Sequence, residues 1–155
     1  MTDEAKKSFT MRITQANKSG LVVILYEMYL TYLEDAFQTE ADRAKFRENI
    51  RKARSCINEL MNSLNFEYEL SYQLLRLYVY VNKEMAAADV RGSSEPLHVC
   101  RRIMSRLMEA YREISREDRS APVMEHTQTV YAGLTYGKGK LTESLVHEGN
   151  RGFLA

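Results

Sequence analysis

The sequence predicts an all-α protein. The first 90 residues contain one of the seven glycines and neither of the two prolines, so little in them interrupts a helix. Apolar residues recur at helical spacing in four successive segments, and short polar connections separate these segments. Short connections make successive helices antiparallel. We therefore expect an antiparallel up-and-down bundle of four helices, or of five, with an extended N-terminal segment and a C-terminal tail.

Capping signals place the first two helices. Gly20 stands where a polar lead segment meets an apolar run, and Asn17 or Ser19 can cap a helix that continues to about Gln38. Thr39 and Asp42 have the spacing of a capping box, with Asp in place of Glu or Gln. This spacing predicts a second helix that runs from there to about Leu64.

The third and fourth helices have clearer boundaries. The third begins near Glu67 and ends at Gly92, where a glycine suits the C' position. The Ser93-Ser94-Glu95-Pro96 run offers a serine cap and a proline in the first turn of the fourth helix, which continues to about Arg116. Five of the seven glycines follow Arg119, where no helical or strand period persists. We therefore divide the chain into a flexible segment (1–18), a helical domain (19–118) and a glycine-containing tail (119–155).

Composition excludes several classes of partner. The formal net charge is +1, which predicts no general attraction to nucleic acid or to a membrane surface. The most apolar run, residues 21–33, is too short for a membrane span of about 20 residues. Residues 1–20 have no apolar core of a secretory signal, so we expect a reducing cytoplasm. Cys56 and Cys100 are then best explained as small core hydrophobes.

The width of each apolar arc distinguishes the helices. The second helix has one narrow apolar seam, and packing against the core of the bundle is enough to explain it. The third has two stripes, which together cover on the order of 220°, against roughly 100° that a bundle helix buries. The first stripe consists of Leu70, Leu74, Leu77, Val81, Met85 and Ala88, and the second of Tyr68, Tyr72, Leu75, Val79 and Ala86. The first helix is similarly wide.

Two explanations of the wide arcs remain open. The first and third helices can be the central pair, with neighbours on two sides, because an apolar stripe is more often core than site. Alternatively, four helices in a square leave part of these arcs uncovered, as an apolar groove that a tail or a partner fills. The tyrosines favour the groove, since a ring with a polar tip tolerates water and still packs when covered.

Several short runs of the sequence resemble the flagellar secretion chaperone family, FliS. The similarity spans about Thr14 to Glu117. It is carried by Leu25-Tyr26, Asn49-Ile50-Arg51-Lys52-Ala53, Ile57-Asn58-Glu59-Leu60, Leu64-Asn65 and Leu74-Leu75-Arg76-Leu77-Tyr78-Val79-Tyr80. The resemblance implies a helical bundle in the bacterial cytosol that binds the disordered C-terminal segment of flagellin along apolar grooves. Such a chaperone prevents premature polymerisation and delivers flagellin for type III export.

The resemblance also implies a set of partner-binding residues and partners. The groove candidates are Leu21, Leu25 and Met28 on the first helix, Tyr68, Tyr72, Leu75 and Val79 on the third, and Met104 and Met108 on the fourth. The implied partners are the flagellin segment and the flagellar export apparatus, and we expect a monomer or a weak homodimer. Two segments are candidate covers of the groove in the free protein. They are the lead segment, with Phe9, Met11 and Ile13, and the tail, with Leu134, Tyr136, Leu141, Leu145 and Val146.

Catalytic and metal motifs are incomplete. Glu95-x-x-His98 has the spacing of a carboxylate-bundle ligand pair but has no second copy, so capping of a helix is the favoured role. The run Gly137-Lys138-Gly139-Lys140 lacks the spacing of a phosphate loop. We expect no enzyme, no cofactor and no metal. The alternative function is a generic helical homodimer or adaptor that hides its excess apolar face by self-association.

Overall fold

The computed structural model describes residues 1–124, which form five helices and no strand. The helices are α1 (Asp3–Gln15), α2 (Lys18–Gln38), α3 (Arg43–Asn62), α4 (Glu69–Arg91) and α5 (Leu97–Glu117). The predicted all-α helical bundle is confirmed. The boundaries of α2 to α5 differ from the predicted ones by a few residues, as is usual for helix ends.

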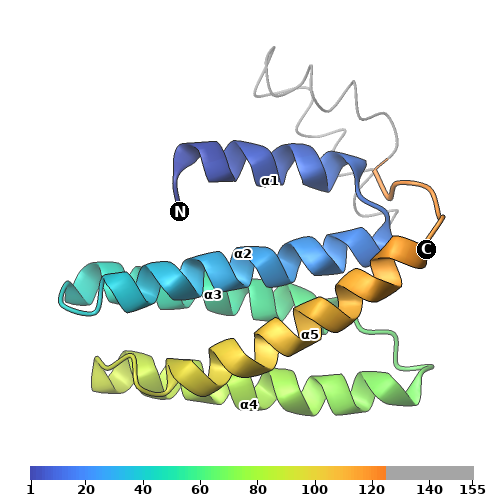
Figure 1. Ribbon diagram of the computed structural model, residues 1–155. Coiled ribbons are helices and arrows are strands. Elements are labelled where there is room, and N and C mark those ends of the chain that lie inside the picture. Colours follow the sequence, from blue (N-terminus) through green and yellow to red (C-terminus); the bar gives the residue numbers. More distant parts are fainter. Residues whose placement is uncertain (125–155) are drawn as a thin grey trace, which may run out of the picture.

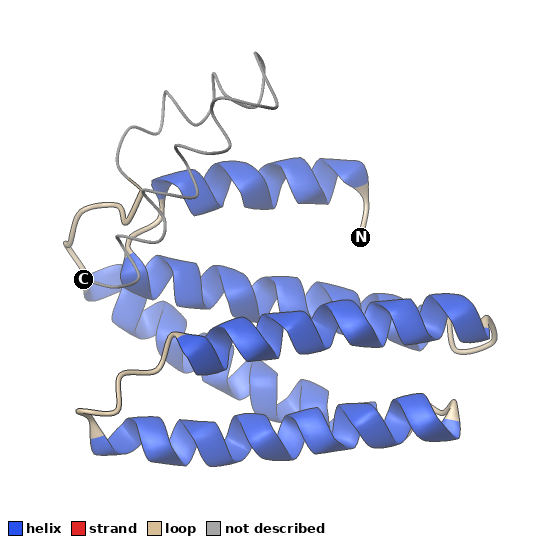
Figure 2. Cartoon of the chain, turned by 180° about the vertical axis from the view of Figure 1, so that it is seen from behind, coloured by secondary structure: helices blue, strands red, loops and turns tan. Residues whose placement is uncertain are grey.

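Helices α2 to α5 form a square, and α1 lies outside it (Figure 1). Helix α2 packs against α3 and α5, and α4 also packs against α3 and α5, so α2 and α4 stand at opposite corners. Helix α1 packs along the outer side of α2. Helices α4 and α5 meet at the loop that joins them and diverge toward their other ends, as both views show (Figures 1 and 2). The N-terminal half of α4 therefore has little cover from α5.

Local capping explains where the helices begin and end. The side chain of Asn17 accepts a hydrogen bond from the amide of Gly20 at 2.9 Å, as predicted for α2. Helix α3 is capped by Asp42, whose carboxylate accepts from the amide of Lys45 at 3.3 Å, and not by Thr39. Gly92 ends α4 with a φ of 65°, where an added Cβ would collide with the guanidinium of Arg43.

The N-terminal segment is helical, which corrects the expectation of an extended chain over residues 1–18. The hydroxyl of Thr2 accepts from the amide of Ala5, and Asp3 and Glu4 place negative charge at the start of α1. Helix α1 has few apolar residues, and Phe9 and Ile13 are only partly buried. Its sequence pattern was too weak to reveal a helix whose stability depends on packing against α2.

The core of the bundle contains three fully buried tyrosines. Tyr26 of α2 and Tyr78 of α4 share a hydrogen bond between their hydroxyls across the diagonal of the square. Tyr29 donates to the sulfur of Met85 at 3.3 Å. Burial raises the pKa of Tyr78 to about 12. These tyrosines are core residues, although tyrosine was expected at an exposed groove. Cys56 and Cys100 are free and buried, as predicted.

The segment after α5 returns to the start of α2. The amide of Val123 donates to the carbonyl of Ala16 at 3.0 Å, and Ser19 donates to the carboxylate of Asp118 at 2.5 Å. The tail residues offered as a cover, from Leu134 to Val146, lie outside the described residues. No helix among residues 1–124 is long and apolar enough to cross a membrane.

Candidate functional site

Helix α4 presents a continuous row of apolar side chains to solvent. Tyr68, Tyr72 and Val79 are 65%, 54% and 54% exposed, and Leu75 is half-buried. We call these four residues the tyrosine stripe. Tyr72, Leu75 and Val79 share one face of α4 because they recur at helical spacing, and Tyr68 is the N-cap residue just before the helix. The inward face is occupied by Leu74, Tyr78, Val81 and Met85. Among the described residues, the bundle therefore leaves Tyr68, Tyr72 and Val79 exposed and covers Leu75 only in part.

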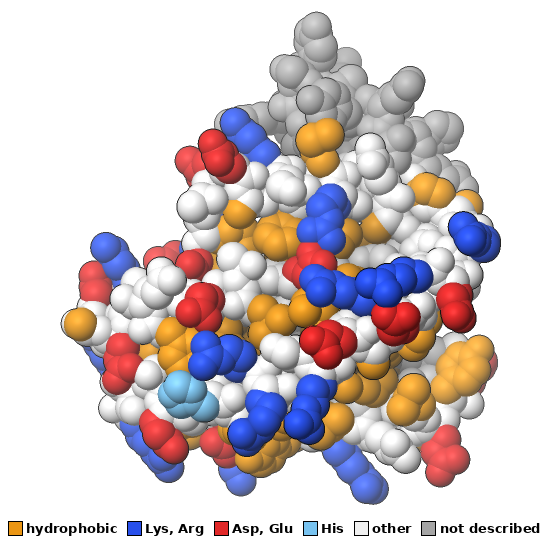
Figure 3. Space-filling model, in the orientation of Figure 1, with side chains coloured by type: hydrophobic (Ala, Val, Ile, Leu, Met, Phe, Trp, Pro, Cys, Tyr) orange, Lys and Arg blue, Asp and Glu red, His pale blue; other side chains and the backbone are white. Residues whose placement is uncertain are grey.

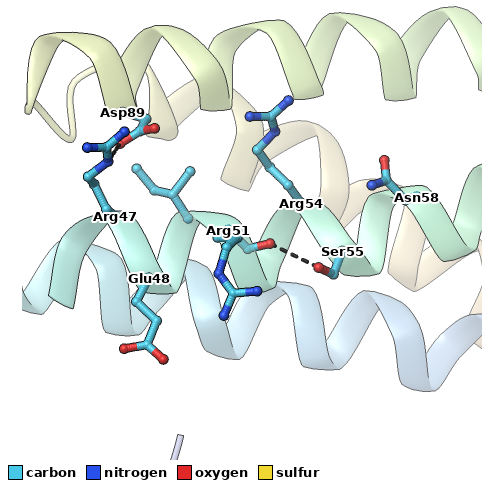
Figure 4. Close-up of a pocket in the computed structure, with 8 residues that line it drawn as sticks. Arg47, Glu48, Arg51, Arg54, Ser55, Asn58 and Asp89 are labelled. Carbon is cyan, nitrogen blue, oxygen red and sulfur yellow. Dashed lines mark hydrogen bonds and ion pairs between the residues drawn. The ribbon is translucent and has the colours of Figure 1, made fainter. Parts of the chain in front are cut away.

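The tyrosine stripe runs along the edge of α4 that faces α3. On this edge, Asn82 and Asp89 follow Leu75 at successive heptad positions. Arg54 of α3 donates to Asn82 Oδ1 at 2.7 Å, and Arg47 Nε lies 3.1 Å from Asp89 Oδ1. Figure 4 shows both arginines extending from α3 toward α4, whereas Arg51 points away from α4. These contacts thus join α3 to the C-terminal half of α4, and the tyrosine stripe lies along the N-terminal half of α4.

A second apolar surface, missed from the sequence, lies on the opposite edge of α4. Leu70 and Leu77, two members of the first stripe, are 56% and 37% exposed. On α5, Ile114 is exposed, and Val99, Ile103 and Leu107 are partly buried against the core. We call this the α4–α5 surface. It is uncovered because α5 diverges from α4, and the helical spacing of Ile103, Leu107 and Ile114 was its only signal in the sequence.

The tyrosine stripe extends into the loop before α4. Phe66, in the loop before the helix, is exposed, and its ring lies 5.2 Å from that of Tyr72. Figure 3 shows hydrophobic side chains gathered at the lower right, over the N-terminal half of α4 and the loop before it. Phe66 was not among the predicted groove residues, because a single apolar residue in a loop has no periodicity. An exposed apolar area of this kind on a small protein indicates an interaction site.

The candidates on α2 do not belong to the same surface. Leu21, Leu25 and Met28 are partly buried, and Leu25 and Met28 pack against the core. They lie on α2, at the corner opposite α4, on the helix that α1 covers. The structure therefore does not bring the α2 and α4 candidates together into one groove.

The two candidates on α5, Met104 and Met108, differ in how deeply they are buried. Met104 is 0% exposed and belongs to the core, so its assignment to the partner-binding surface was wrong. Its position on α5 points between the helices of the square, where its unbranched chain fills space. Met108, one turn later, is partly buried against the same core. Neither methionine offers the open contact area that the tyrosine stripe has.

Helix α1 is held to the bundle by ion pairs at both ends of its contact with α2. Arg12 lies 2.5 Å from one carboxylate oxygen of Glu27, and Arg112 of α5 lies 3.0 Å from the other. Burial alone would raise the pKa of Glu27, but hydrogen bonds from the two arginines lower it below its usual range. The N-terminal ammonium pairs with Asp35. Charged contacts thus join α1 to α2, beside the partly buried Phe9 and Ile13.

The described residues offer little to hold a metal. Glu95 and His98 are exposed, and the ring of His98 lies 4.9 Å from that of Phe37. Among residues 1–124, no group of three or more His, Cys, Asp or Glu side chains is placed to bind an ion. Burial raises the pKa of both the Cys56 and the Cys100 thiols to about 12, which disfavours the reactive thiolate.

Comparison with known proteins identifies a family. The family model described as Flagellar protein FliS matches residues 1–118. This match covers all five helices, including α1. Among curated proteins, none matches the chain.

Proposed function

We propose that this chain, which belongs to the FliS family of flagellar proteins, holds the C-terminal segment of flagellin along the exposed surfaces of α4. Membership of the family implies a flagellar export chaperone for flagellin, and this family is not a known enzyme family. Binding takes place in the bacterial cytosol and keeps flagellin from polymerising before the complex is delivered to the export apparatus.

The exposure of the tyrosine stripe carries this proposal. A disordered segment that folds on binding loses about 2–5 kcal/mol of its gross interaction energy to ordering, so it needs a long apolar surface and not a small pocket. Helix α4 is 23 residues long and exposes apolar side chains on both edges of its N-terminal half. An amphipathic helix places its apolar anchors at i, i+3, i+4 and i+7. The residues of the tyrosine stripe recur with the same spacing of three or four positions, so such a helix can pack along them.

Tyrosine suits a surface that is alternately free and occupied. In the free chaperone, the hydroxyls of Tyr68 and Tyr72 keep contact with water, and in the complex their rings supply apolar area. Helix α1 is a second element that can change place, because charged contacts hold it and water competes for these. Its departure would uncover the outer side of α2, where Glu27 lies.

Titration of the full chain with a flagellin C-terminal segment tests the proposal. Gel filtration with light scattering should show a free monomer, or a weak dimer, that forms a one-to-one complex with the segment. Circular dichroism should show helix gained in the mixture beyond the sum of the two components. The flagellin N-terminal segment is the matched control and should give neither change. A tight dimer that ignores the C-terminal segment would instead support the homodimer or adaptor.

A further inference from the structure

The tyrosine stripe lies between basic side chains on both of its sides. On the α3 side, Arg54 reaches across to Asn82, one turn beyond Val79 on α4. On the other side, Arg76 and Lys83 each follow a member of the stripe, Tyr72 and Val79, by one helical turn, and both are exposed. The apolar row is therefore bordered by positive charge along its C-terminal half.

These three cations have no acidic partner within the part of the chain that the structure describes. Arg54 is bound to a neutral amide, whereas its neighbour Arg47 is paired with Asp89 at 3.1 Å. On the other faces of the bundle, Arg12, Arg101 and Arg112 all meet carboxylates. The charge around the tyrosine stripe is thus available to a partner that covers the exposed apolar side chains.

We propose that the occupant of the tyrosine stripe is an amphipathic helix whose apolar face is flanked by carboxylates. This inference rests on the proposed function, in which the occupant is the flagellin segment, and it adds a charge pattern to that segment. Apolar contact with the stripe supplies most of the affinity, while Arg54, Arg76 and Lys83 select the partner. A segment with lysine at the same flanks meets like charge and is rejected.

The charge pattern also gives the occupant a direction. Glu67 and Glu69 stand at the start of α4, beside Tyr68, so the N-terminal end of the stripe is acidic. Arg76 and Lys83 stand further along the helix. The carboxylates of the bound helix therefore lie over the half of the stripe around Val79, and its end over Tyr68 is neutral or basic.

Two synthetic amphipathic peptides test the inference on the full chain. They share one leucine face and carry either glutamate or lysine at the flanking positions. The glutamate peptide should bind about tenfold more tightly at low salt, since opposite charges attract across the contact and like charges repel. The difference should shrink as ionic strength rises. Equal affinity of the two peptides at low salt would overturn the inference.

Reversing the charges on α4 tests whether these residues cause the preference for the glutamate peptide. The Arg76→Glu/Lys83→Glu double variant should lose or invert the preference for the glutamate peptide. The Arg102→Glu/Arg106→Glu variant makes the same change in net charge on exposed positions of α5 and should keep the preference. Identical behaviour of the two variants would overturn the assignment to α4.

The flagellin C-terminal segment is titrated in parallel to separate this inference from the proposed function. Binding of that segment by a chaperone that does not discriminate between the peptides overturns the inference and leaves the function intact. Discrimination without binding of the flagellin segment overturns the function and supports the charge pattern.

Discussion

The guanidinium of Arg12 on α1 lies 2.5 Å from a carboxylate oxygen of Glu27 on α2. Glu27 is mostly buried, and its second oxygen meets Arg112 of α5 at 3.0 Å. One carboxylate therefore joins the outer helix to two helices of the square. Because α1 buries few apolar side chains, this contact is a large part of what holds it in place.

Acid should release α1 from α2. The folded-state pKa of Glu27 lies below its ordinary value, so its contribution to docking is complete above pH ~4.5 and is lost as the pH falls through the lowered pKa. Amide hydrogen exchange, corrected for the intrinsic pH dependence, should show α1 losing protection in this range while the buried helices keep theirs. In the Glu27→Gln variant, α1 should be less protected at neutral pH and less sensitive to acid. A wild-type α1 that keeps constant protection in acid until the buried helices lose theirs would contradict this account.

The hydroxyls of Tyr26 and Tyr78 should be coupled in stability. Tyr26→Phe leaves the other hydroxyl buried without its partner, and so does Tyr78→Phe, at about 1–3 kcal/mol each. The double variant removes both groups and should cost less than the sum of the singles. Urea unfolding at neutral pH measures all four proteins. Tyr80→Phe, on the exposed side of α4, is the control and should change little. Strict additivity would show that the hydroxyls do not stabilise each other.

Substitutions at Tyr72 and Met104 should separate binding from folding. Tyr72→Asp alters a side chain that is 54% exposed, so the free energy of unfolding should change by less than about 0.5 kcal/mol. Its affinity for the flagellin segment should fall at least about tenfold, as for an aromatic anchor at an interface. Met104→Ala leaves a cavity in the core and should destabilise the fold by about 2–5 kcal/mol. Thermal unfolding and calorimetric titration measure the two effects. A Tyr72 variant that unfolds would place this residue in the core.

Sequence reasoning found the tyrosine stripe but misplaced some of its neighbours. Helical spacing identifies which residues share a face, and the excess width of the apolar arc on α4 correctly indicated exposure of Tyr68, Tyr72 and Val79. The same spacing grouped Leu70 and Leu77 with the buried Leu74 and Val81, although Leu70 and Leu77 are exposed. Met104, a candidate implied by the family resemblance, is buried in the core. Periodicity gives the width of an arc, but it does not say which part of that arc a neighbouring helix covers.

The sequence by itself determined the helical class, the approximate limits of α2 to α5 and the surplus of apolar surface. These follow from local chemistry, because glycine, proline and capping residues end helices wherever they occur. Only the tertiary structure decided which apolar residues stay uncovered, since this depends on the oblique path of α5 across α4. Tertiary contacts also decided that α1 is a helix and that Tyr26 and Tyr78 are buried. A weak helix needs a surface to pack on, and a buried hydroxyl needs a partner that is distant in the sequence.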